Sequence, residues 1–155
     1  MTKEEKQLIL KDLCARLPYR PYVLEFWKFK DEKDFREYSK PAKLGVNLLA
    51  SIHQWANNDG ITDRMYKPLL LPLSTMAKEQ RREFYEAVRP VIIEGFKETE
   101  LLDYDKDNED RPVTQKLVAP DVVETDWLNA HHFDYRGLIE KGLAIDATKL
   151  NIYTL

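Results

Sequence analysis

The chain has a single cysteine, Cys14, and only five glycines among its 155 residues. One cysteine excludes the intrachain disulfide framework of small secreted domains. The few glycines form no phosphate-cradling loop, and no serine stands in a G-x-S-x-G turn. The sequence therefore lacks the short motifs of nucleotide binding and of serine-based catalysis.

Long hydrophobic runs and an excess of positive charge are also missing. No stretch of eighteen apolar residues occurs, and the opening MTKEEKQLILKDLC interrupts its apolar runs with charges, unlike a signal peptide. The formal net charge is −3, so the whole molecule has no field that attracts phosphate backbones. We expect a cytoplasmic protein with no membrane partner, and nucleic acid is a disfavoured partner.

The composition is that of a folded globular protein, with 43% hydrophobic and 33% charged residues. A chain of 155 residues is about one ordinary domain long and can bury a real core. We therefore predict a single domain over residues 1–155. The expected elements place it in the α+β class, with an N-terminal helix, a small antiparallel sheet, a central helix and a C-terminal pair of short helices.

The first predicted element is a helix that begins after Thr2. Thr2 followed by Glu5 forms a capping box, in which each side chain accepts a hydrogen bond from a backbone amide of the helix start. An apolar stripe recurs at helical spacing, with charged residues largely outside it. The stripe comprises Leu10, Leu13, Cys14 and Leu17, and the charged residues are Lys3, Lys6, Lys11 and Asp12. Pro18 ends the helix, and Cys14 is predicted to be a small core residue.

A half-buried strand is predicted in YVLEFWKFK, residues 22–30, where large apolar residues alternate with polar ones. Residues 44–57 fit two structures. Their apolar residues recur at helical spacing, but alternate residues are also apolar, as in a strand that runs into an Asn-Asn-Asp-Gly turn. We favour the helix, in which His53 is half-buried.

Residues 66–76, YKPLLLPLSTM, contain two prolines, which exclude a central helix and favour an extended or edge conformation. We predict a connector that packs along the core. Ser74 or Thr75 then caps a central helix through AKEQRREFYEAV. Its predicted inner face comprises Met76, Phe84 and Val88. Pro90 either kinks this helix or begins a second one.

The composition becomes acidic over residues 98–115. Four carboxylates alternate there, namely Asp103, Asp105, Asp107 and Glu109. The pattern differs from an EF-hand calcium loop, because Asn108 replaces the glycine and Thr114 replaces the bidentate glutamate. We predict a flexible, solvated acidic loop with no bound metal.

Regular secondary structure is predicted again in residues 126–146, DWLNAHHFDYRGLIEKGLAID. Thr125 or Asp126 can cap a short helix that starts at Trp127. Asp134 can cap a second short helix through YRGLIEK, because its carboxylate accepts hydrogen bonds from free helix amides. These two helices form the predicted C-terminal pair.

The second of these helices is predicted to end at Gly142. Glycine adopts the left-handed conformation that closes many helices, and the residue after it often contacts the last turn. Leu143 would then touch Leu138, as in a Schellman motif. Asp134, Gly142 and Leu143 are thereby explained without any reaction.

This segment, together with KPLLLPLSTM and the opening TKEEKQLILKDLCARLPY, resembles a group of short uncharacterised proteins of gut anaerobic bacteria and their phages or mobile elements. Members of that group have arginine where this chain has Leu71 and threonine where it has Ala77, so no role of the connector's charge or cap is transferred. The resemblance implies an α+β fold and a setting on mobile or phage-derived DNA. It implies no activity and no functional residue.

His131, His132 and Asp134 are the candidate site residues. Zinc sites on helices use spacings such as two histidines four residues apart, whereas adjacent residues point in different directions on a helix or a strand. The two imidazoles therefore converge on one ion only if the chain bends, for instance at Phe133. A histidine oriented by Asp134 would suit acid–base work, but no further catalytic group stands at a diagnostic spacing.

We favour a structural role for this pair, in which one imidazole bonds a backbone carbonyl or an acid and the other packs or faces water. We accordingly predict no catalytic residue, no cofactor and no metal ligand. The alternative is a small metal-dependent or acid–base enzyme centred on His131, His132 and Asp134.

The favoured function is a non-catalytic accessory or protein-interaction module of a bacterial mobile element or phage. Eight tyrosines, six phenylalanines and three tryptophans could supply a partner surface as well as a core. The expected partner is a protein, and the oligomeric state is left open. A weaker alternative is a nucleic-acid binder that uses Arg81, Arg82 and Arg89. We interpret that stretch as a solvated helix face interleaved with glutamates.

Overall fold

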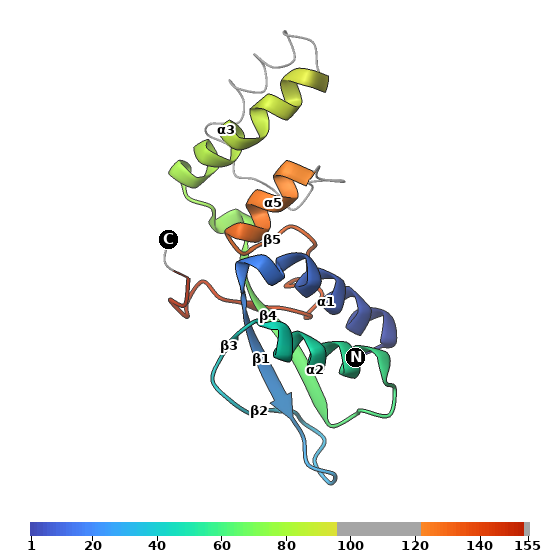
Figure 1. The fold of residues 1–155 in the computed structure, drawn as a ribbon. Helices are drawn as coiled ribbons and strands as arrows, with labels where there is room; N and C mark the ends of the chain where they lie inside the picture. Colours follow the sequence, from blue (N-terminus) through green and yellow to red (C-terminus); the bar gives the residue numbers. More distant parts are fainter. Residues whose placement is uncertain (96–121, 154–155) are drawn as a thin grey trace. The chain divides into compact units, whose positions relative to one another are not determined.

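In the computed structural model, residues 1–95 and 122–153 are described, and most of their side chains. The predicted acidic loop over residues 98–115 lies outside these ranges. Helices and a mixed sheet are both present, which confirms the α+β class (Figure 1). Contacts within the chain divide it into two compact units. One unit comprises Met1–Leu70 and Leu138–Leu155, and the other comprises Leu71–Gly137. We call them the first and the second unit; a single domain over residues 1–155 stays a prediction.

Helix α1 (Lys3–Arg16) begins at the predicted capping box. The backbone N of Glu5 donates to Thr2 Oγ1 at 3.1 Å, and the backbone N of Thr2 donates to Glu5 Oε2 at 2.7 Å. The helix ends before Pro18, as predicted, and the 3-10 turn η1 (Leu17–Tyr19) follows. Both ends of α1 are therefore set by local sequence.

The buried face of α1 differs from the prediction. Cys14 is exposed, whereas Asp12 and Arg16 are fully buried and Lys6 is nearly so. Arg16 Nε donates to Asp12 Oδ2 at 2.8 Å, one helical turn apart. Burial of a charge requires such a partner, and the pair turns the charged side of α1 inward and Cys14 outward.

Residues 44–57 are helical, as favoured, in α2 (Val46–Asn57). Ile52, Trp55 and Ala56 are buried on its inner face. The helical period that buries these three residues turns His53 outward, so His53 is exposed rather than half-buried.

The strand predicted over residues 22–30 is β1 (Tyr22–Trp27). Along one edge it pairs antiparallel with two short strands, β2 (Arg36–Glu37) and β3 (Ala42–Lys43). Val23 and Leu24 point to opposite faces of the sheet and are both buried. This end of β1 is therefore covered on both sides, and the prediction of a half-buried strand holds only for its other end.

Strand β4 (Arg64–Pro72) pairs on both of its edges. It runs antiparallel to β1 and parallel to β5 (Phe133–Asp134) and β6 (Ile145–Asp146). The sheet is therefore mixed, and the prediction of a purely antiparallel sheet is wrong. The extended conformation predicted for the segment that begins at residue 66 is confirmed as far as Pro72, but β4 pairs on both edges, so the edge position and the connector role are wrong.

Pro68 is compatible with this central position because of the register of β4. Lys28 N donates to Asp63 O at 3.0 Å, so the even-numbered residues of β1 direct their backbone groups toward β4. Val23, which lies opposite Pro68, therefore belongs to a pair without ladder hydrogen bonds. The missing N–H of the proline costs no bond to β1.

The core of the first unit lies between the sheet and the two helices, and Figure 1 shows α1 and α2 side by side over β1 and β4. This core comprises Ile9, Leu10, Leu13, Val23, Leu44, Ile52, Trp55, Ala56, Tyr66, Leu70, Leu138, Leu143 and Ala144. Trp55 and Tyr66 meet edge to face, with ring centroids 5.3 Å apart. Aromatic pairs of this geometry stabilise a core beyond their buried area alone.

Tyr153 completes the sheet where β1 and β4 separate. The backbone N of Tyr22 donates to the Tyr153 hydroxyl at 2.8 Å, and that hydroxyl donates to Leu69 O at 2.7 Å. The regular pairing of the two strands ends next to this point, at Val23 and Pro68. The phenol therefore takes the place of a direct backbone bond between β1 and β4.

The second unit contains η2 (Leu73–Thr75), α3 (Lys78–Gly95) and α5 (Val122–Ala130). The prediction that Ser74 or Thr75 caps α3 is wrong, because both residues lie in η2. Ala77 precedes α3 instead, and its backbone N donates to Gln80 Oε1 at 2.8 Å. The backbone of α3 continues through Pro90, so this proline does not begin a second helix.

An aromatic cluster joins the elements of the second unit. The Trp127 ring of α5 lies 5.3 Å from the Phe84 ring of α3 and 6.0 Å from the Phe133 ring of β5. Trp127 lies well inside α5, so the prediction that Thr125 or Asp126 caps a helix starting there is wrong. The helix begins upstream, at residues with no predicted cap.

The predicted second C-terminal helix is also absent. Asp134 belongs to β5, and the residues after it form turns. The predicted ending is nevertheless present, because Gly142 has a φ of 70° and Leu143 N donates to Leu138 O at 2.8 Å. Gly142 N donates to Ile139 O at 3.0 Å, which completes the two bonds of a Schellman motif on a single turn.

We expect Tyr153→Phe to lower the free energy of unfolding by about 1–3 kcal/mol, because it leaves the Tyr22 amide and the Leu69 carbonyl without their bridging hydroxyl. Tyr22→Phe is the matched control, since its hydroxyl makes no hydrogen bond within the described ranges. Urea unfolding of both variants measures the difference. Equal stability of the two variants would contradict the bridging role.

Stability should also fall at alkaline pH. Burial raises the pKa of Tyr153, so the folded protein keeps the phenol proton after the unfolded chain has begun to lose it near pH 10. This contribution is present below about pH 10 and is lost as the pH rises toward the folded pKa. Burial also raises the pKa of Tyr66 and Tyr85. Urea unfolding measures the free energy of unfolding at pH 8 and at pH 11. Its decrease between these two pH values should be smaller for Tyr153→Phe than for the unchanged protein.

Candidate functional site

His131 is held by the end of α5. Its backbone N donates to Trp127 O at 3.1 Å, and its Nδ1 lies 2.9 Å from the same carbonyl oxygen. The imidazole also stacks on the Trp127 indole, with centroids 3.8 Å apart and planes 17° apart. This is the structural role predicted for one imidazole of the pair.

His132 forms the bend of the chain between α5 and β5. Its φ is 63°, a left-handed conformation that is uncommon for residues other than glycine, although asparagine, aspartate and histidine adopt it more often than the rest. Its backbone N donates to Asn129 O at 3.2 Å, and its carbonyl accepts from Leu71 N at 2.9 Å. The chain thus bends at His132, one residue before the position at which a bend was considered for the metal-site alternative, and β5 begins beside β4 directly after it.

Asp134 is fully buried and lies opposite Pro72 in the pairing of β5 with β4. Over residues 1–95 and 122–153, no group of three or more His, Cys, Asp or Glu side chains could hold a metal ion. His131, His132 and Asp134 stay the candidates of the metal-dependent or acid–base alternative. The positions observed for them serve the turn and the strand.

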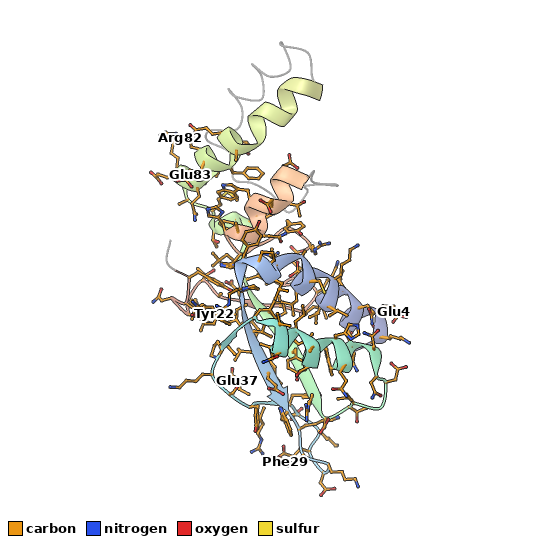
Figure 2. All side chains as sticks on the ribbon, in the orientation of Figure 1. Glu4, Tyr22, Phe29, Glu37, Arg82 and Glu83 are labelled. Carbon is orange, nitrogen blue, oxygen red and sulfur yellow. The ribbon has the colours of Figure 1, made fainter. Side chains whose placement is uncertain are left out.

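The arginine stretch of α3 is partly used in the fold. Arg81 is half-buried, and its Nη1 donates to Met76 O at 2.8 Å just before the helix. Arg82 is exposed next to the exposed Glu83 (Figure 2). The side chain of Arg89 lies outside the described set. The part of the stretch that is described mixes charges of both signs, as expected for a solvated helix face.

An aromatic surface, which the sequence did not single out, lies where β1 runs into β2. We call Trp27, Phe29, Tyr38 and Arg64 the hairpin surface. Phe29 is 72% exposed and Tyr38 61% exposed. Figure 2 shows Phe29 in the loop where the chain leaves β1.

Tyr38 is ordered although it is exposed. Its ring stacks on Trp27 with centroids 4.6 Å and planes 22° apart, and its backbone N donates to Glu25 O at 2.9 Å. The Arg64 guanidinium, directly across the ladder from Trp27, lies 4.5 Å from the indole centroid. Trp27 Nε1 donates to Glu25 Oε1 at 2.7 Å. The indole is thus held on several sides, and it in turn holds Tyr38.

The first unit also contains a half-open pocket of about 350 Å³, which we call the basic pocket. It is bounded by the start of α1, the end of α2, the loop before β4, the start of β4 and the β1–β2 loop. Its lining residues are Met1, Lys3, Lys6, Lys28, Phe35, Trp55, Asp59, Ile61, Thr62, Arg64 and Met65. Four of these residues are cationic and one is a carboxylate.

The sequence contains no signal for either surface. Lys6, Lys28 and Arg64 are separated by long intervals with no shared motif, and they meet only because α1 packs on the sheet. Trp27 lies in the strand predicted over residues 22–30, where alternation alone does not distinguish it from the other large apolar residues. Only the i,i+4 spacing of Asp12 and Arg16 was a local sign that α1 turns charged residues inward.

We expect His132→Val to lower the free energy of unfolding by about 1–2 kcal/mol more than His132→Asn, because a β-branched residue is strained in the left-handed conformation and asparagine is not. Both variants lose the imidazole, so the comparison isolates the backbone. Urea unfolding monitored by circular dichroism gives the values. If the two variants were equally stable, the bend would not require this backbone conformation.

The comparisons with known proteins give no family. No family model matches the chain, and no curated protein or solved structure matches it. None of the helices in the described part of the chain is long and apolar enough to cross a membrane. The geometry of the hairpin surface and of the basic pocket is therefore the ground for any functional proposal.

Proposed function

We propose that this chain is a non-catalytic protein-interaction module that binds a partner protein through the hairpin surface. The observation that carries the proposal is the stacking of the exposed Tyr38 on Trp27, which is itself held by Arg64 and Glu25. The stack leaves most of the Tyr38 surface exposed, with the exposed Phe29 as a further ring of this surface, so both rings are available to a partner.

The residue types of this surface suit protein recognition. Binding energy at protein interfaces is concentrated in tryptophan, tyrosine and arginine, and aromatic residues supply much contact area for few rotatable bonds. Association costs free energy for each side chain that it immobilises. Because Tyr38 is already stacked in the free protein, less of that cost remains for the complex.

A polar rim accompanies the exposed rings. The loop after Phe29 exposes Lys30, Asp31, Lys33 and Asp34. Interfaces between proteins commonly have an aromatic centre and a hydrated, charged rim of this kind. The mixed signs favour a partner surface that is itself mixed in charge, rather than a nucleic-acid backbone.

The biological setting of the proposal comes from the resemblance of the C-terminal segment to proteins of gut anaerobic bacteria and their phages or mobile elements. In that setting the partner would be a host or replication protein. No residue role depends on this resemblance.

The test compares the unchanged protein with Phe29→Ser/Tyr38→Ala in pull-downs from a lysate of a gut anaerobic bacterium. Val46→Ser is the matched control, because Val46 is 73% exposed and lies outside the hairpin surface. We expect a partner that the unchanged protein and the control capture and that the double variant loses. The purified partner should then bind at least about tenfold more weakly to the double variant, since each interface hot spot contributes 1 kcal/mol or more.

A partner that binds the double variant as tightly as the unchanged protein would contradict the proposal. So would the absence of any protein captured above background. Melting curves of the three proteins show whether a lost interaction reflects the surface or a loss of folding.

A further inference from the structure

The basic pocket contrasts with the charge of the whole chain. The protein has a formal net charge of −3, yet Lys3, Lys6, Lys28 and Arg64 line this pocket, and Asp59 is the one carboxylate among the described residues that line it. Like charges gathered around a concave surface repel one another, and the low-dielectric wall strengthens their field. A bound anion would relieve that repulsion.

Lys6 is the most buried of the four cations. Its residue is only 9% exposed, and its ammonium group lies 3.4 Å from Ile61 O and 5.2 Å from the Trp55 ring centroid. No carboxylate among the described residues lies within ion-pairing distance of it. A carbonyl and an aromatic face solvate an ammonium ion only in part, so an anion in the pocket would give this mostly buried lysine a compensating charge.

The other cations are placed in a similar way. Lys28 Nζ lies 5.2 Å from the Phe35 centroid, and the Arg64 guanidinium lies over Trp27. Within residues 1–95 and 122–153, neither has a carboxylate at ion-pairing distance. Lys3 has one, Asp59 at 3.8 Å, but both side chains are mostly exposed, so water and salt screen this pair strongly.

We propose that the basic pocket binds a small phosphate anion with two or more negative charges, such as a diphosphate group. Tetrahedral phosphate oxygens can accept hydrogen bonds from several cations at once, and a guanidinium can bind two of them together. The pocket volume of about 350 Å³ lies at the lower end of the range for small-molecule sites. A compact phosphate compound therefore suits the pocket better than an extended polymer.

Pyrophosphate is the probe. Isothermal titration calorimetry of the full chain at constant ionic strength should give a single saturable site, and binding should weaken as salt is added. Lys6→Met/Lys28→Met should weaken it at least about tenfold, because charge-assisted hydrogen bonds are lost while the aliphatic stems remain. Lys11→Met/Lys40→Met removes the same charge from exposed residues outside the pocket, and it should bind like the unchanged protein.

Three results would overturn the proposal. The first is no saturable binding of pyrophosphate. The second is an equal loss of affinity in both double variants, which would show attraction to net charge alone. The third is equal affinity for pyrophosphate and citrate, which would remove the preference for phosphate. If Lys6→Met prevents folding, as melting curves would show, Lys28→Gln alone with Lys40→Gln as its control provides the same comparison.

A second readout locates the ligand. Backbone amide shifts in a two-dimensional nuclear magnetic resonance titration should move for residues 59–65, most of which line the pocket, and stay unchanged for residues 138–147. Shifts spread evenly over both segments would contradict a single site. Phe29→Ser/Tyr38→Ala should keep pyrophosphate binding, so this inference and the proposed protein interaction can fail separately.

Discussion

The pairing of β4 on both edges is the constraint on which the rest of the structure depends. A strand buried in this way must find partners for backbone groups on each side, because an unpaired N–H or carbonyl away from water is costly. β1 supplies one set of partners, and the short strands β5 and β6 supply the other. The bend at His132 comes directly before β5, and the turn at Gly142 comes shortly before β6. Both direct the chain into a strand that pairs with β4. His132 and Asp134, which the sequence offered as candidate site residues, lie at the bend before β5 and within β5.

Charged side chains are used in two different ways in the first unit. Asp12 and Arg16 neutralise each other inside it, and Glu25 accepts hydrogen bonds from Trp27 and from the Tyr66 hydroxyl. These groups are compensated within the protein, so they contribute order rather than a binding site. Lys6 differs, since its ammonium group has a carbonyl and an aromatic ring beside it and no carboxylate at ion-pairing distance within the described part of the chain. The contrast between compensated and partly compensated charges separates the structural charges from those available to a ligand.

Local features could be predicted from the sequence, and long-range ones could not. The Thr2–Glu5 capping box and the Gly142 ending depend on residues within a few positions of each other, and both are present as expected. The caps expected at Ser74 and Asp134 are absent, because tertiary pairing places those residues in a 3-10 turn and in a strand. β5 and β6 contain two residues each, too few to show alternation, so their parallel pairing left no pattern. Cys14 was expected to be buried and Asp12 to be exposed, whereas the structure exposes Cys14 and buries Asp12. Hydrophobic periodicity cannot predict this, because it treats every charged residue as exposed, including the members of a buried ion pair.

The bridge made by Tyr153 has a consequence for how the chain acquires its structure. The hydroxyl joins Tyr22 and Leu69, which precede it by 131 and 84 residues. A ribosome adds about 5–20 residues each second, so β1 and β4 emerge several seconds before the group that bridges them. During that interval the sheet lacks both Tyr153 and β6, and its exposed edges can pair with other chains. Contacts this distant in sequence also slow folding, which makes the newly made chain, more than the finished protein, the form most exposed to aggregation.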